Sequence, residues 1–404
     1  MNHQRLIPLE AMRGLAAIIV LVHHVLLGFA PYISGLLPQA RNANSFVGEW
    51  YFFLFNGTSS VTFFFTVSGF VLCWSYFHSG DKSDLLKAFF KRWPRLAGLV
   101  LITCLSSYLI FKLGFYYYEP ASLISNSTWL LNFGCPTPYC ADGWAIRFEP
   151  SLLDAFTQGL TTFFTGDSTY NTNLWTMKLE FIGSIVVFLI AAFISLILSF
   201  NYLVTASIIF LIWALSVNPY LVPFIAGIFL SAIVAKYKTK IGLRFALSLM
   251  IIGVYLLSYL IPEKDFAWVT LIQYPSLIAD NIRIIINTIA SVLIIFSIMA
   301  NDVIFNKING KFFSFLGKLS FPLYLVHTLV ICSISSFSFI TMHHYGYTDE
   351  LIFIITFLIT LSSSIIVSLP LIYMDSFWLK KINHIASMLF KKTNHVINEE
   401  KNKN

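Results

Sequence analysis

Apolar stretches that are long enough to cross a bilayer recur along almost the whole chain, and short polar or charged connections separate them. A spanning α-helix needs roughly 20 predominantly apolar residues. The pattern therefore predicts an all-α fold, a polytopic membrane bundle of about ten transmembrane helices. The predicted spans are 9–30, 59–77, 97–118, 174–200, 202–217, 219–235, 243–261, 281–300, 320–339 and 350–374. Two segments that merge at the tight turns near 200 and 218 would change the number of spans without changing the side on which the chain ends.

The composition excludes a water-soluble core. Hydrophobic residues make up 57% of the 404 residues and charged residues only 11%, whereas a soluble domain has about 25% charged residues. An integral membrane domain is predicted over residues 1–380, followed by a basic tail, 381–404, that is predicted to be disordered. The sequence shows no internal repeat and no appended soluble domain, so we expect the membrane bundle to carry the activity.

Lysine and arginine are distributed unevenly between the two sides of the predicted bundle. The net charge of +7 could suggest a nucleic-acid partner, but the basic residues lie in short clusters beside apolar spans. Cytoplasmic loops carry an excess of Lys and Arg. With a cytoplasmic N-terminus, the outer side holds only these of the 26 basic residues: Arg41, Lys112, Arg147, Lys178, Lys264 and Arg283. We therefore expect both termini in the cytoplasm, a bacterial inner membrane location, contact with membrane lipids and no nucleic-acid partner.

The predicted outer loop, residues 119–173, contains Cys135 and Cys140 in the segment CPTPYC. In an oxidising periplasm these two cysteines could form a disulfide, and two free thiols are the alternative. The other three cysteines lie in predicted spans, where a buried thiol behaves as a small hydrophobe.

Arg13 and His24 are polar side chains within the first predicted span. At 100° and 1.5 Å per residue they share one helix face and lie about 16 Å apart along the axis, whereas His23 points elsewhere. An ionisable side chain inside a bilayer is a functional hypothesis by default. Histidine has an ordinary pKa of about 6.5, so its neutral form can act as a general base. The alternative is a His24 that only hydrogen-bonds to a neighbouring helix.

Arg92 and Arg95 precede the third predicted span on its cytoplasmic side. They can share a helical face, and guanidinium groups suit phosphates. A basic run at this place is also what the positive-inside rule produces, so the cluster alone does not establish a phosphate site.

Glu180 lies about two turns inside the fourth predicted span, where a carboxylate needs a partner. Lys178 cannot share its helix face, so the partner is expected from another helix. His24 lies at a compatible depth, and a carboxylate that orients a base is a recurring arrangement.

Gly317, Ser320, Tyr324 and His327 follow three- and four-residue spacing and so form a polar face on the ninth predicted span. Small and polar stripes also let membrane helices pack closely. A second such stripe lies on the second span, where packing is the preferred interpretation, although Ser68 could approach a ligand: Ser59, Thr62, Thr66 and Gly69. No histidine spacing indicates a metal site.

Five segments, in this order, resemble acyltransferase family 3, and the resemblance covers about residue 5 to residue 380. The segments are Leu9–Ala17 with His24, Phe63–Phe70, Arg92 with Arg95, Trp175–Glu180 and Gly317–His327. The resemblance implies a membrane enzyme that O-acetylates surface polysaccharide, lipopolysaccharide or peptidoglycan. It implies acetyl-coenzyme A, or another acyl-coenzyme A, as donor substrate and no bound cofactor. It also implies that the positions of Arg13, His24, Arg92 and Arg95 are needed for activity.

The sequence therefore predicts that His24 and Glu180 are catalytic and that Arg13, Arg92 and Arg95 bind the acyl-coenzyme A. Candidate positioning groups are Ser68, Tyr324 and His327. The expected acceptor is a glycan or a lipid-linked glycan. A proton-coupled small-molecule transporter or exporter is the main alternative, because it would use the same buried groups as a proton relay, and a non-catalytic assembly component is the third.

Overall fold

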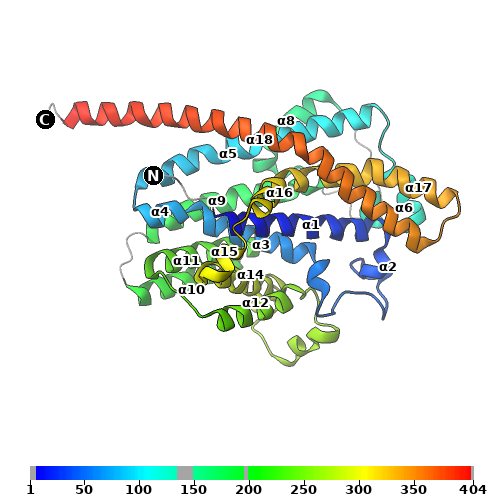
Figure 1. Cartoon of the computed structure of the whole chain (residues 1–404), viewed down its shortest axis with the longest axis horizontal. Coiled ribbons are helices and arrows are strands. Elements are labelled where there is room, and N and C mark those ends of the chain that lie inside the picture. The colour runs from blue at the N-terminus through cyan, green and yellow to red at the C-terminus, as the bar shows by residue number, and fades with distance from the viewer. Residues whose placement is uncertain (1–5, 134–148, 195–198, 402–404) are drawn as a thin grey trace.

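The computed structural model describes residues 6–133, 149–194 and 199–401, with side chains described up to residue 388. The long helices lie nearly side by side as one bundle (Figure 1). They are α1 (Ile7–Phe29), α3 (Gly57–Leu72), α5 (Lys82–Lys112), α9 (Trp175–Ile194), α10 (Phe200–Val217), α11 (Val222–Tyr237), α12 (Leu243–Leu257), α14 (Ile282–Ala300), α16 (Lys311–Val330) and α18 (Asp349–Lys401).

Shorter helices connect or extend these elements. They are α2 (Pro31–Ser34), α4 (Trp74–Ser79), α6 (Tyr118–Ser125), α7 (Thr128–Leu131), α8 (Leu152–Thr165), α13 (Ser276–Ala279), α15 (Asp302–Lys307) and α17 (Ser336–His344). The 3₁₀ turns are η1 (Pro38–Ala40), η2 (Phe52–Leu54), η4 (Thr172–Leu174), η5 (Pro219–Leu221) and η6 (Lys264–Leu271), and a π-helical turn, η7 (Ile331–Ser335), joins α16 to α17.

The predicted all-α membrane bundle is confirmed. Within the described residues, 9 helices are long and apolar enough to cross a membrane. The remaining predicted span corresponds to α12, an apolar helix of 15 residues. Each predicted span therefore has a helix, although several boundaries differ.

Helix α5 begins well before the predicted span 97–118. Asp81 caps it, since its carboxylate accepts a hydrogen bond from the Ser83 backbone N–H at 2.8 Å, and such caps satisfy the free amides of a first turn. The basic cluster therefore lies inside a helix and not before one. A search for apolar windows misses this start because the first turns of α5 are polar.

The predicted outer loop is wrong in part, because α8 packs into the bundle beside α5. A Cβ atom on Gly159 would lie 2.7 Å from the Cα of Leu101, and Trp93 Nε1 donates to the Leu160 carbonyl at 3.2 Å. With 14 residues, α8 is too short to span a bilayer. Gly166, with φ of 81°, ends it in the left-handed region.

Close helix contacts depend on glycine at two crossings. A Cβ atom on Gly14 of α1 would lie 2.3 Å from the Leu316 carbonyl oxygen of α16, and one on Gly69 of α3 would lie 2.1 Å from the Phe224 carbonyl oxygen of α11. Both distances are impossible for a real side chain. The packing interpretation of the small-residue stripe on α3 is thereby confirmed at Gly69.

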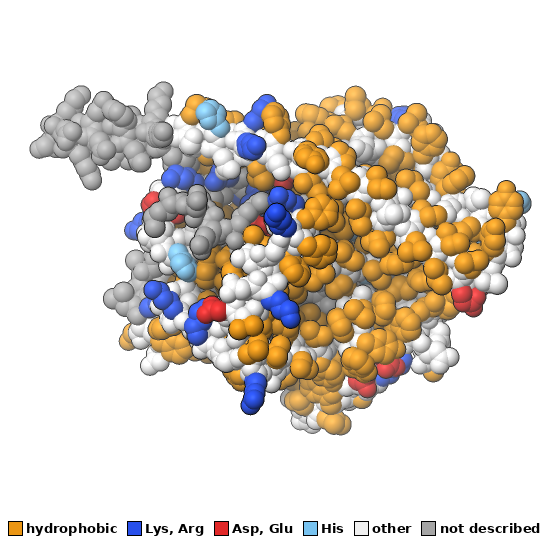
Figure 2. Space-filling model, in the orientation of Figure 1, with side chains coloured by type: hydrophobic (Ala, Val, Ile, Leu, Met, Phe, Trp, Pro, Cys, Tyr) orange, Lys and Arg blue, Asp and Glu red, His pale blue; other side chains and the backbone are white. Residues whose placement is uncertain are grey.

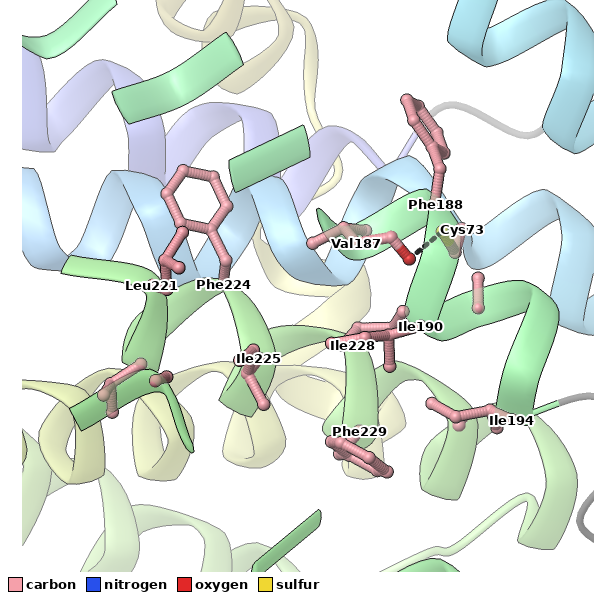
Figure 3. Close-up of a cluster of buried hydrophobic side chains, with 14 of the residues drawn as sticks. Cys73, Val187, Phe188, Ile190, Ile194, Leu221, Phe224, Ile225, Ile228 and Phe229 are labelled. Carbon is pink, nitrogen blue, oxygen red and sulfur yellow. Dashed lines mark hydrogen bonds between the residues drawn. The ribbon is translucent and has the colours of Figure 1, made fainter. Parts of the chain in front are cut away.

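One buried apolar cluster joins α9 and α11 to the end of α3 (Figure 3). Val187 of α9 and Ile228 of α11 both belong to this cluster, and the Cys73 thiol lies 4.0 Å from the Val187 carbonyl. Cys73 is fully buried in this cluster, which confirms its predicted behaviour as a small hydrophobe.

Helix α18 continues as helix to Lys401, through the tail that the sequence predicts to be disordered. The helix is held beside α5, where Trp378 Nε1 donates to the Pro94 carbonyl at 2.7 Å. Lys91 Nζ also donates to Asn383 Oδ1 at 3.2 Å. These contacts anchor α18 beyond its most apolar part.

Charge differs between the two ends of the bundle. Figure 2 shows Lys and Arg side chains gathered toward the end at which α1 begins, while apolar side chains cover most of the remaining surface. At the opposite end, Arg41 pairs with Glu263 at 3.2 Å and Lys264 pairs with Glu49 at 2.9 Å. The end at which α1 begins is called the basic end below.

Candidate functional site

Two histidines from different helices meet inside the bundle. His24 Nδ1 of α1 lies 2.8 Å from His327 Nε2 of α16, and the two rings are 13° from parallel. His327 is completely buried and His24 is partly exposed. The close crossing of α1 and α16 at Gly14 holds the two helices together, so their packing fixes this pair.

The Leu323 carbonyl determines which nitrogens of the pair carry hydrogen. His327 Nδ1 lies 3.0 Å from this oxygen, which can only accept, so Nδ1 is the protonated nitrogen. Neutral His327 then accepts at Nε2, and His24 Nδ1 donates to it. The free lone pair of neutral His24 is therefore at Nε2, as in a base whose tautomer a hydrogen-bonding neighbour fixes.

Trp129 of α7 covers one face of His24. The ring centroids lie 4.7 Å apart at an angle of 10°. Helix α7 is anchored to α1, because Ser127 Oγ donates to the Leu27 carbonyl at 2.6 Å. His24 is therefore held between an indole and a second imidazole.

His23 points away from this site, as its position on α1 predicts. Its Nδ1 lies 2.9 Å from the Phe55 carbonyl oxygen and 3.1 Å from the Gly57 amide nitrogen. It supports the start of α3.

Two asparagines before α9 bind the middle of α16. Asn171 Nδ2 donates to the Leu325 carbonyl at 2.7 Å, and Asn173 Nδ2 donates to the Tyr324 carbonyl at 2.8 Å. Both asparagines are buried. Non-helical backbone at membrane depth needs such internal partners, so this segment fixes the part of α16 that carries His327.

The predicted polar face of α16 is confirmed. Ser320, Tyr324 and His327 are all buried. The Tyr324 hydroxyl lies 2.8 Å from Thr176 Oγ1 and donates to the Asn173 carbonyl at 3.2 Å. Ser320 Oγ is buried, and no group in residues 6–133, 149–194 or 199–388 forms a hydrogen bond with it. The face therefore contains both satisfied and unsatisfied polar groups next to α1.

Glu180 has partners other than the predicted His24. It forms a buried ion pair with Arg92, and its Oε1 accepts from Ser68 Oγ at 2.6 Å. Arg92 Nε also donates to Ser184 Oγ at 3.0 Å. The prediction that Glu180 orients His24 is therefore wrong, while Ser68 does reach the polar centre of the bundle.

The depth at which α9 starts explains this error. The sequence places the start of the helix at the outer surface, whereas Asn173 already lies beside Tyr324 in the middle of α16. Glu180 follows about 10 Å further along α9. It therefore lies closer to the basic end than the histidines do.

The three predicted donor-binding arginines form one electrostatic cluster. The Arg92 guanidinium lies close enough to repel the charges of Arg13 and Arg95, and Arg13 also repels Arg95. The carboxylates of Glu10 and Glu180 attract the Arg13 charge. Arg95 is exposed, whereas Arg92 is buried in its ion pair. The cluster therefore combines an arginine that is held in an ion pair with an arginine that is exposed as a residue.

Arg13 is the member of this cluster that contacts the interior of the bundle. Its Nε is buried without a hydrogen-bond partner among the described residues, and its guanidinium carbon lies 5.8 Å from the centre of the Phe64 ring. Such a contact is a cation–π interaction. Arg13 therefore has donor capacity that the described protein groups leave unused at Nε.

The sequence also matches one known protein family. The family model Acyl_transf_3, described as an acyltransferase domain, covers residues 7–373. The chain belongs to this acyltransferase family. The match runs from α1 into α18 and includes the histidine pair, the arginines and Glu180. Searches of curated proteins and of solved structures give no match for this acyltransferase.

Several other predicted features of the acyltransferase lie outside the histidine site or outside the described residues. Cys135 and Cys140 fall outside the described residues. Lys178 Nζ donates to the Thr165 carbonyl at 3.3 Å. A cation is favourable at this place, because the carbonyls at the C-terminus of α8 carry partial negative charge. In the part of the chain that the structure describes, no group of three or more His, Cys, Asp or Glu residues could hold a metal ion.

Sequence reasoning missed Trp129 and Asn171. Trp129 lies in the predicted outer loop, and no spacing links it to His24. A usable signal for Asn171 was its position shortly before the segment Trp175–Glu180, because an amide at membrane depth needs hydrogen-bond partners. The structure thus adds an aromatic cover and a helix clamp to the acyltransferase site.

Proposed function

We propose that this membrane acyltransferase moves an acetyl group from acetyl-coenzyme A to a hydroxyl of a cell-surface glycan, such as O-antigen or an exopolysaccharide. The observation that carries the proposal is the His24–His327 pair, which leaves His24 Nε2 free to accept a proton. Family membership supplies the reaction class, and the arginine cluster supplies a site for the donor phosphates.

The donor binds from the basic end, which faces the cytoplasm with both chain termini. Arg95 is exposed there, and its guanidinium contacts the phosphates together with Arg13. Arg92 is paired with Glu180, so it adds positive potential and positions the cluster. This arrangement matches the charge bias of cytoplasmic loops and a location in the bacterial inner membrane.

The transfer step needs a base that takes the proton of the acceptor hydroxyl. His24 Nε2 takes the proton of the acceptor hydroxyl as its oxygen attacks the thioester carbonyl. The C–O bond forms and the C–S bond breaks. His24 passes the proton to the sulfur, so coenzyme A leaves as the thiol. His327 stabilises the imidazolium by accepting from Nδ1, as the third group of a triad does.

A His24→Ala variant tests the proposal. We expect it to abolish acetylation of the surface glycan while its level in the membrane stays normal, because the variant removes the nitrogen that takes the proton of the acceptor hydroxyl. The measurement is mass spectrometry of surface glycans from a deletion strain that carries the wild-type or the variant chain.

His23→Asn serves as the matched control. It keeps a polar atom near the Nδ1 position that contacts Phe55 and Gly57, so acetylation should persist. Near-normal acetylation in His24→Ala would overturn the assignment of the base. An unchanged glycan in the deletion strain would favour the transporter or the assembly component over the enzyme.

A further inference from the structure

Three consecutive phenylalanines on α3 have different surroundings. Phe63 and Phe65 are buried at 3% and 2% exposure, and each belongs to a separate apolar cluster. Phe64 is only partly buried and packs against three of the clusters. Phe64 therefore borders several parts of the bundle interior without being enclosed in any one of them.

The Phe64 ring lies between the arginines and the histidines. At one side it contacts the Arg13 guanidinium, 5.8 Å from the ring centre. At another it contacts the Tyr324 ring, 5.9 Å away at 63°. The Tyr324 ring in turn lies 6.0 Å from that of His327. Phe64 therefore contacts both Arg13 and the tyrosine next to His327, so a donor that is held at Arg13 and reacts near the histidines would lie beside this ring.

Two unpartnered polar atoms mark the same level of the bundle. Gly317 lies against Glu10, and one turn further along each helix come Ser320 and Arg13. Within the part of the chain that the structure describes, Ser320 Oγ and Arg13 Nε are both buried without a hydrogen-bond partner. Such groups cost free energy unless a ligand or water satisfies them. A ligand whose polar part satisfied these atoms would place its apolar end near Phe64, which contacts Arg13.

We propose that Phe64 determines acyl specificity, because its ring occupies the space into which a longer acyl chain of the coenzyme A thioester would extend. This inference rests on the proposed function, since it names the part of the donor that Phe64 contacts. Acetyl is short enough to stop at the ring, whereas butyryl and hexanoyl chains collide with it. Phe64 acts on the size of the acyl group and not on the phosphates.

The test measures dissociation constants of acetyl-, butyryl- and hexanoyl-coenzyme A for the full chain in lipid nanodiscs. We expect the wild type to bind acetyl-coenzyme A most tightly. In Phe64→Ala the preference should move toward the longer chains, by about fourfold for each additional methylene that becomes buried. Phe63→Ala and Phe65→Ala are matched controls that should keep the wild-type order, because their rings lie in other clusters.

The outcomes separate the two proposals. If the wild type binds none of the three thioesters, the proposed donor and this inference both fail. If the wild type binds acetyl-coenzyme A and Phe64→Ala keeps its preference, only the inference fails. An equal change in Phe63→Ala also overturns it. Phe64→Leu answers the same question should the alanine variant not fold, because it removes ring volume and leaves a smaller gap.

Discussion

At the scale of single residues, the site separates two kinds of polar contact. The His24–His327 contact leaves one nitrogen lone pair free, so it can take part in proton transfer. Arg92 and Glu180 form an ion pair with each other, and they also hydrogen-bond to Ser184 and Ser68. Breaking a buried pair leaves an uncompensated charge, so we expect this second group to organise the cluster.

His327 is expected to act through His24 as a positioning residue. His327→Ala removes the acceptor that fixes the His24 tautomer, so kcat should fall on the order of 10²-fold or more, while KM for acyl-coenzyme A stays the same. His327→Gln places an amide oxygen near the former Nε2 and should recover part of the rate. The measurement is steady-state acyl transfer by purified protein.

A change of KM without a change of kcat would contradict this role for His327. So would equal rates for the alanine and glutamine variants, because only one of them can accept a hydrogen bond from His24.

At the scale of elements, the site depends on how closely helices approach. Helix α1 carries His24 and α16 carries His327, and their crossing has no room for a side chain at Gly14. The segment before α9 adds a second restraint through Asn171 and Asn173. The histidine distance is therefore set by contacts at two other depths of the bundle.

Gly14→Ala is expected to reduce activity at least tenfold. Its Cβ would meet the Leu316 carbonyl at 2.3 Å, so α1 and α16 must move apart, and overpacking of this kind costs roughly 1–3 kcal/mol. The measurements are transfer rate and thermal stability of the purified chain.

Gly242→Ala is the control for the Gly14 variant, because nothing lies within 4 Å of its Cβ position. Full activity in Gly14→Ala would show that the close crossing does not position the histidines.

At the scale of the whole molecule, charge gives the bundle a direction. Basic side chains gather at the end where α1 begins (Figure 2), and the arginine cluster opens toward that end through the exposed Arg95. At the other end, Arg41 and Lys264 are neutralised by acidic partners. In the function proposed above, the donor therefore approaches from the basic end.

We expect the C-terminus of α18 to be cytoplasmic. A green fluorescent protein fused there should fluoresce and an alkaline phosphatase should be inactive, because the phosphatase needs export. The connection between α12 and α14 should give the reverse result. An active phosphatase at the C-terminus would invert the bundle and place the arginines on the outer side.

Much of the site was predictable wherever a single helix carries it. Arg13 and His24 share a face by helical periodicity alone, and Ser320, Tyr324 and His327 form a stripe for the same reason. The Glu180 partner was predicted wrongly, because its choice depends on the depth at which α9 begins. Helix α8 was missed because 14 residues fall below the length by which spans are recognised.

The bilayer environment, the class of fold, the uneven charge and the polar faces of individual helices all followed from the amino-acid sequence. Composition and local periodicity carry this information, since each is a property of residues that are neighbours along the chain. The contacts of His24 with His327, of Glu180 with Arg92 and of Trp129 with His24 became known only from the folded structure. These contacts join residues that are far apart in sequence, and they depend on helix crossings that glycines and buried amides fix in space.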